Sequence, residues 1–119
     1  MTTHISYSTA KKLKAFLGES APEPMEDNKR GYYGKDLMCY VPEESATERH
    51  KYTFDGYAYR LEDLLSKPFC EAFLDTMENK KHWCPVDSNA DLSHELAYKY
   101  FFGGLPAVEK ALCEMMEGK

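Results

Sequence analysis

The clearest signal in the sequence is the recurrence of apolar residues at helical spacing, first near the N-terminus and then through most of the second half. Near the N-terminus they share one side of a helix with 3.6 residues per turn: Ala10, Leu13, Phe16 and Leu17. Ser8 can cap the free amides at the start of this segment, and Gly18 supplies a left-handed residue at its end. The pattern predicts a helix over residues 9–17.

The second half predicts a single helical turn at residues 61–65 and three longer helices. One covers residues 68–78 and begins at Pro68, a residue tolerated at the first helical position. Another begins after Ser88, which forms a capping-box pattern with Asp91, and runs to about Phe102. Gly103-Gly104 ends it, and Leu105-Pro106 begins the last helix. The faces expected to be buried are Phe69, Cys70, Phe73, Leu74 and Met77, then Leu92, Leu96, Ala97, Tyr100 and Phe101, then Val108, Leu112, Met115 and Met116.

Strand-favouring residues occupy the region between these helical segments. Residues 32–33 and 37–41 flank Gly34-Lys35-Asp36, a spacing that predicts a hairpin with a glycine-assisted turn. Residues 52–54 and 57–59 alternate aromatic and small or polar side chains around Asp55-Gly56, a dipeptide typical of tight hairpin turns. The alternative for this second segment is an irregular loop leading into Leu61.

Segregated strands and helices predict an α+β fold, because alternating strands and helices would be needed for a parallel sheet. We expect a small antiparallel sheet of short strands in the N-terminal half, packed against an N-terminal helix and a C-terminal group of three to four helices. A chain of 119 residues with 43% hydrophobic residues is of single-domain size, so residues 1–119 are expected to form one α+β domain.

Charge and cysteine usage narrow the classes of function. The net charge of −5 disfavours direct binding of nucleic-acid phosphates. Apolar runs are too short for a membrane span and the first residues lack a secretion signal, so we expect a cytoplasmic protein. The four cysteines have isolated spacing, which favours free thiols over a disulfide framework: Cys39, Cys70, Cys84 and Cys113.

Three segments carry a resemblance to a known group of proteins. They are residues 8–14 (STAKKLK), residues 61–73 (LEDLLSKPFCEAF) and residues 103–112 (GGLPAVEKAL). These segments are similar to small uncharacterised proteins carried by tailed phages and prophages. The resemblance implies a viral or prophage accessory origin, which for a phage-encoded protein means the host cytoplasm, and it carries over no catalytic or binding residue.

Few residues offer the grouping that catalysis or metal binding requires. His82, Cys84 and His94 lie close together in sequence and combine imidazole and thiolate ligands that suit zinc, so they support an alternative as a small metal- or thiol-dependent enzyme. Neither a CxxC nor an HxxxH pair accompanies them. Ser8-x-x-Lys11 matches the spacing of penicillin-recognising enzymes but lacks their other motifs. We therefore expect no catalytic residue, no metal site and no cofactor, and lean towards a protein that is not an enzyme.

Aromatic residues in the strand region are the unusual feature of the composition. Aromatic side chains that no helix covers would form a tyrosine-rich surface, and such residues are enriched in protein interfaces. Alternatively, the same side chains could pack in the interior of a small sheet. The predicted function is protein binding, by self-association or by inhibition of a host protein, and a structural virion component is a further alternative. The predicted contact residues are the exposed tyrosines of the strand region and the glutamates near them: Tyr33, Tyr52, Tyr57, Tyr59, Glu43 and Glu44.

Overall fold

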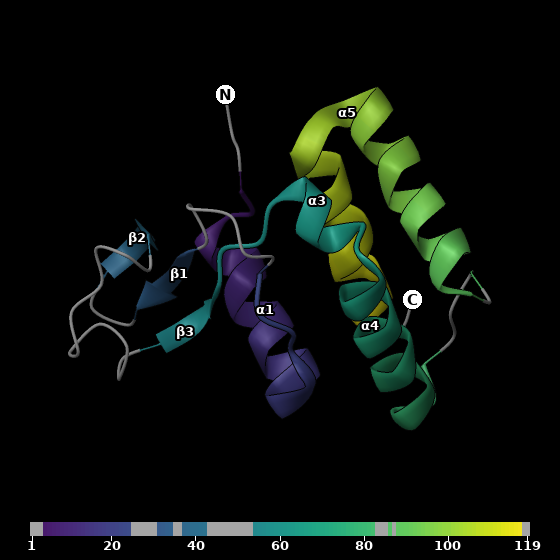
Figure 1. The fold of residues 1–119 in the computed structure, drawn as a ribbon, viewed down its shortest axis with the longest axis horizontal. Helices are drawn as coiled ribbons and strands as arrows, with labels where there is room; N and C mark the ends of the chain where they lie inside the picture. The colour runs from purple at the N-terminus through teal and green to yellow at the C-terminus, as the bar shows by residue number, and fades with distance from the viewer. Residues whose placement is uncertain are drawn as a thin grey trace.

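The computed structural model of the chain describes residues 4–24, 31–34, 37–42, 54–82, 86 and 88–117. Most of these residues are helical, and Figure 1 colours the elements from purple to yellow in chain order. The helices are α1 (Tyr7–Leu17), the short 3-10 helix η1 (Gly18–Ser20), α3 (Leu61–Leu64), α4 (Lys67–Asn79) and α5 (Asn89–Met116). The strands are β1 (Gly31–Gly34), β2 (Leu37–Pro42) and β3 (Phe54–Tyr57).

The predicted α+β class is wrong, because helices dominate the described residues and supply nearly all of their core. The strands are only 4, 6 and 4 residues long, whereas α4 and α5 span 13 and 28 residues. Among the buried apolar side chains that the structure describes, Tyr33 is the only one that lies in a strand. The strands therefore do not form a layer that carries the core, and the fold is mainly α.

The three strands pair in the order β2-β1-β3. β1 and β2 lie on the two segments expected for the first hairpin and pair antiparallel, with Tyr33 opposite Tyr40. The predicted second hairpin is wrong, because Asp55 and Gly56 lie inside β3 rather than in a turn. A Cβ added to Gly56 would lie 2.5 Å from the carbonyl oxygen of Ala10, so this glycine permits close approach of α1 to β3.

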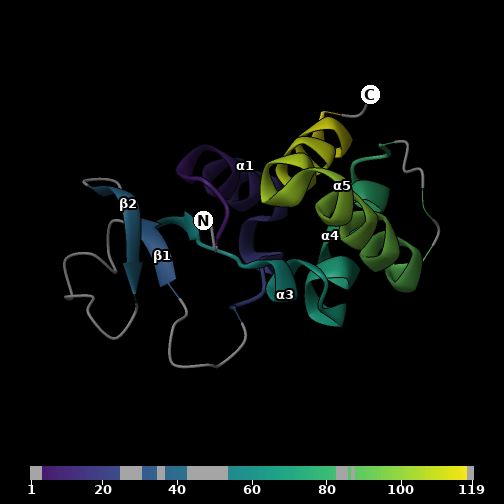
Figure 2. The same cartoon turned by 90° about the horizontal axis from the view of Figure 1, so that it is seen from above.

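Three parts of the molecule follow one another along its longest axis (Figures 1 and 2). The strands lie at one end, α1 lies in the middle, and α4 with α5 forms the other end. Where these parts meet, Phe69 and Phe73 of α4 are fully buried, and Phe16 of α1 packs against Phe73 with ring centroids 5.3 Å apart. The other fully buried large side chains are Ile5, Leu13, Leu64, Met77, Leu92, Leu96, Leu112 and Val108.

Helix α1 begins two residues earlier than the sequence predicts. Its cap is Ser6, whose Oγ accepts the amide of Thr9, so the predicted cap at Ser8 is wrong. The Ser6 amide and hydroxyl both donate to Glu109 Oε1, at 2.9 and 2.8 Å. This carboxylate from α5 lies at the positive end of α1, where the helix dipole favours negative charge. The end of α1 at Gly18, with a φ of 58°, is as predicted.

Helix α5 consists of two arms that fold back on each other, residues 89–103 and 105–116 (Figure 1). Ser88 Oγ accepts the amide of Asp91, which confirms the predicted cap. Gly104 has a φ of 72° and a ψ of −168°, outside the helical region, which confirms the predicted break. A Cβ on Gly103 would lie 2.6 Å from the Cβ of Ala107, so the corner is closely packed. No helix in the described part of the chain is long and apolar enough to cross a membrane.

Candidate functional site

Two of the four tyrosines predicted to contact a partner are buried in the structure. Tyr33 and Tyr59 are buried, and each hydroxyl donates to a backbone carbonyl oxygen: Tyr33 to Ile5 at 2.7 Å and Tyr59 to Pro22 at 2.6 Å. Neither belongs to the exposed members on which the prediction rested. Burial is also the main cause that raises the pKa of the Tyr59 hydroxyl far above its ordinary value.

Of the four remaining predicted contact residues, the structure describes only Tyr57. Tyr57 is half-buried and lines a pocket, with its ring centroid 5.8 Å from that of Tyr59. Tyr52, Glu43 and Glu44 lie outside the described residues. Of the predicted contact set, Tyr57 alone is a described residue with a partly exposed side chain.

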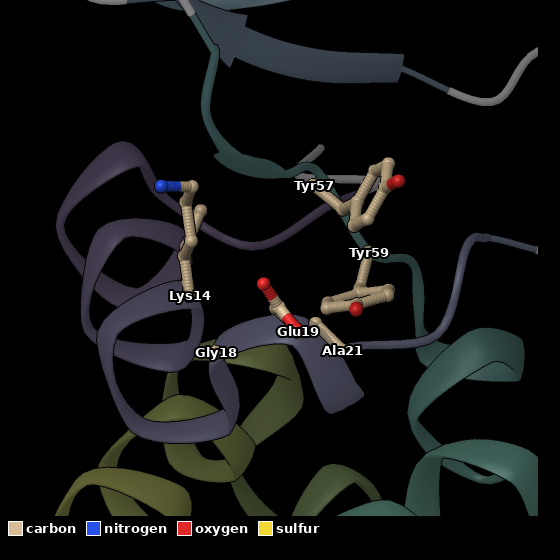
Figure 3. A pocket seen from close by; sticks show the side chains of 7 residues that line it. Lys14, Gly18, Glu19, Ala21, Tyr57 and Tyr59 are labelled. Atoms are coloured by element: carbon tan, nitrogen blue, oxygen red, sulfur yellow. The ribbon is translucent and has the colours of Figure 1, made fainter.

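The pocket lies between α1, η1 and β3 and has a volume of about 390 Å³. Figure 3 shows Lys14 and Glu19 on the helical side of this pocket, opposite Tyr57 and Tyr59, with the amine of Lys14 directed away from their rings. The small residues between them leave the space open: Ala10, Gly18 and Ala21. A volume of this size is at the lower end of the range of about 300–1,000 Å³ that small-molecule sites occupy.

The largest exposed apolar feature of the described residues is on α5, not on the strands. Four aromatic residues lie at the end of its first arm: Tyr98, Tyr100, Phe101 and Phe102. We refer to them as the aromatic patch. Their exposed fractions are 59% for Tyr98, 42% for Tyr100, 81% for Phe101 and 69% for Phe102. The patch occurs at the corner where α5 turns at Gly104, at the top of Figure 1.

Three rings of the aromatic patch, those of Tyr98, Phe101 and Phe102, form a contact cluster. Tyr98 and Phe102, one helical turn apart, have ring centroids separated by 4.6 Å, and Phe101 packs edge-on against Phe102 at 5.1 Å. These separations are those of favourable aromatic pairs. The surface is therefore a preformed cluster, whose side chains lose little further conformational freedom when a partner covers them.

The sequence analysis assigned part of this patch to the core, and that assignment is wrong. Leu92 and Leu96 are buried as predicted, but Tyr100 and Phe101 are exposed. Phe101 follows Leu96 by five residues, which places it about 140° around a helix of 3.6 residues per turn. The apolar residues of this arm cover more of the helix circumference than one buried stripe does. That excess was the feature of the sequence that indicated an exposed surface.

The structure gives no support to a metal centre. Within the described ranges, no group of three histidine, cysteine or acidic side chains is positioned to hold a metal ion. His94 is exposed on α5, whereas His82 follows α4 and packs its ring 5.8 Å from that of Phe16. The Nδ1 atom of His82 is buried and has no hydrogen-bond partner. Cys84 lies outside the described residues.

The described thiols and phenols are explained by packing. Cys70 is fully buried, its Sγ donates to the carbonyl oxygen of Leu64 at 3.4 Å, and burial raises its pKa to about 11. A thiol with this pKa is almost entirely protonated at neutral pH and is a poor nucleophile. The Tyr7 hydroxyl donates to the buried carboxylate of Asp55 at 2.6 Å, which raises the pKa of Tyr7 and joins α1 to β3.

Comparisons with protein-family models, curated proteins and solved structures found no match to this chain. The resemblance to phage and prophage proteins stays a prediction, and so does the accessory origin that it implied. The aromatic patch and the pocket are the features of the described residues that bear on function.

Proposed function

We propose that this protein acts without catalysis, by binding another protein through the aromatic patch on α5. The observation that carries the proposal is the exposure of four aromatic residues within five consecutive positions. With about 150–250 Å² per aromatic side chain, the exposed fractions of Tyr98, Phe101 and Phe102, whose rings form one cluster, amount to roughly 300–500 Å². That area is within the range of the largest patch that a typical monomer exposes, and such patches are often functional.

The area of the patch is also suitable for the centre of an interface. A standard interface covers about 800 Å² on each partner, so the contacting rings of the patch would supply about half of one side. Tyrosine is enriched among the residues that dominate binding energy, and such residues cluster at the centre of an interface. The surrounding contacts would then come from the flanking polar residues of α5.

The charges beside the patch indicate what kind of surface it would bind. Glu95 and Lys99 lie on the same arm of α5, and their charged atoms are 3.8 Å apart. Because these opposite charges offset each other, the flank offers no strong attraction to a charged surface. The partner is therefore a protein with an apolar, weakly charged surface, and binding depends little on salt.

The test uses a double variant, Phe101→Ser with Phe102→Ser, and a control variant, Lys110→Ser, on the exposed side of the second arm. Both changes are at exposed positions, so the far-ultraviolet circular dichroism should be unchanged. Sedimentation equilibrium from about 5 to 500 µM measures self-association, in the micromolar range of ordinary weak interfaces. Covalent capture from cells, followed by titration of the purified captured protein, measures binding to a different chain.

We expect the double variant to bind its partner at least about tenfold more weakly, because removing a central aromatic side chain costs more than about 1.4 kcal/mol. The control variant and a rise in salt from 0.05 to about 0.5 M should each change affinity less than about threefold. Equal affinity of wild type and double variant would exclude the patch as the binding surface. A monomeric wild type that also has no titratable partner would exclude the proposed function.

A further inference from the structure

The pocket between α1, η1 and β3 is separate from the aromatic patch, since no residue of α5 lines it. Its walls come from two segments of the chain, residues 10–21 and 57–59, which lie side by side because α1 packs against β3. Lys14 is in the last turn of α1 and Glu19 in η1, whereas Tyr57 ends β3 and Tyr59 follows it. A binding role for this pocket would be independent of the proposed protein binding.

One side of the pocket recognises apolar groups. The rings of Tyr57 and Tyr59 lie 5.8 Å apart and are tilted by 51°. The hydroxyl of Tyr59 already donates to the carbonyl oxygen of Pro22, and Tyr59 is buried, so the half-buried Tyr57 presents most of the exposed ring surface. A flat or branched apolar group can pack against such a surface, and aromatic rings do so in offset or edge-on arrangements.

The other side carries one positive and one negative side chain, those of Lys14 and Glu19 (Figure 3). They are the charged residues among those that line the pocket. An ammonium has three N–H donors and can serve more than one acceptor, while a carboxylate has two oxygens that accept. The pair can therefore bind a ligand that carries a carboxylate and an ammonium group at the same time.

We propose that this pocket binds a small zwitterion with an apolar body, namely a free α-amino acid with an aromatic side chain. Lys14 binds its carboxylate, Glu19 binds its ammonium group, and the side chain packs on Tyr57 and Tyr59. The volume of about 390 Å³ suits a ligand of this size better than a nucleotide or a larger cofactor. Ala10, Gly18 and Ala21 leave the necessary space because their side chains are small or absent.

The test titrates the full chain with L-phenylalanine and follows backbone amide shifts by nuclear magnetic resonance. Two analogues separate the charged groups: 3-phenylpropionate lacks the ammonium, and 2-phenylethylamine lacks the carboxylate. The variants are Lys14→Gln, Glu19→Gln and Ala21→Leu, the last of which fills the pocket without changing charge. Lys11→Gln and Glu71→Gln are the matched controls, because both residues are exposed and neither lines the pocket.

We expect phenylalanine to bind with a dissociation constant of about 0.1–1 mM, since its charged contacts are near solvent. Lys14→Gln should weaken phenylalanine and 3-phenylpropionate but not 2-phenylethylamine, and Glu19→Gln should do the reverse, each by about two- to fivefold. Ala21→Leu should weaken all three ligands, and the controls none. Absence of saturable shifts up to about 10 mM would overturn the proposal. Equal affinity for all three compounds, or shifts that map outside the pocket, would overturn it as well.

Discussion

Substitution of Gly56 by alanine tests how closely α1 packs against β3. The added Cβ would lie 2.5 Å from the carbonyl oxygen of Ala10 and 2.8 Å from its carbonyl carbon. Ordinary contact begins near 3.4 Å, so the helix and strand would have to separate by roughly 0.9 Å. Both atoms belong to the backbone, which means that no side-chain rotation can relieve the contact.

The expected loss of stability follows from two opposing effects. Overpacking of a closely packed interface costs about 1–3 kcal/mol, and a backbone contact places this case in the upper part of the range. Alanine in place of glycine restricts the unfolded chain, which restores about 0.4–1 kcal/mol. The net decrease in the free energy of unfolding of Gly56→Ala is therefore about 2 kcal/mol, or a melting temperature lower by about 8 °C.

Urea denaturation followed by circular dichroism at 222 nm measures this decrease. The slope of the free energy of unfolding against urea concentration should stay unchanged if the unfolded state is the same. Lys11→Ala is the control, since Lys11 is exposed on the same helix and its replacement should change stability by less than about 0.5 kcal/mol. A Gly56→Ala protein as stable as the control would show that α1 and β3 are not in the close contact described above.

Three further predictions concern a buried tyrosine hydroxyl, two thiols of different burial and a partly buried histidine. Tyr33→Phe should lower the free energy of unfolding by about 1–2 kcal/mol in urea denaturation, because it leaves the carbonyl oxygen of Ile5 without its buried donor. In the native protein at pH 8, peptide mapping after iodoacetamide treatment should show Cys113 modified well before Cys70, and equal rates would contradict the burial and raised pKa of Cys70. Burial lowers the pKa of His4 in the folded protein from its ordinary value of 6.5. The unfolded chain therefore binds a proton at His4 more readily than the folded protein does, and stability falls as the pH drops below about 6.5. His4→Gln should reduce the loss of stability between pH 7.5 and 5.5 in thermal melts, and an unchanged loss would contradict the assignment.

Local signals in the sequence predicted the helices well. Ser88 and Gly104 have fixed conformational roles that do not depend on distant residues, since a serine hydroxyl caps the next turn and glycine accepts a positive φ. The buried positions of α4, Phe69 and Phe73, also follow from helical spacing alone. Such features involve residues within about one helical turn of each other.

The candidate sites could not be predicted in the same way. The sequence placed the exposed aromatic surface among Tyr33 and its neighbours and placed Phe101 in the core, whereas the structure has Tyr33 buried and Phe101 exposed. Exposure depends on which element covers a side chain, and that is decided by packing between segments far apart in the chain. The pocket likewise exists only because α1 brings Lys14 opposite Tyr57, 43 positions later in the sequence.

The sequence by itself determined where α5 begins and breaks and where α1 ends, because serine capping and glycine conformations are local properties. It did not determine where α1 begins, since the cap is Ser6 and not the predicted Ser8. Tertiary structure alone decided that Asp55-Gly56 is part of a strand, since the carbonyl of Ala10 lies where a side chain at residue 56 would be. It also decided the mainly α character of the fold, because helices supply most of the buried apolar side chains that the structure describes. Burial is a property of the assembled chain, and no local pattern of residues contains it.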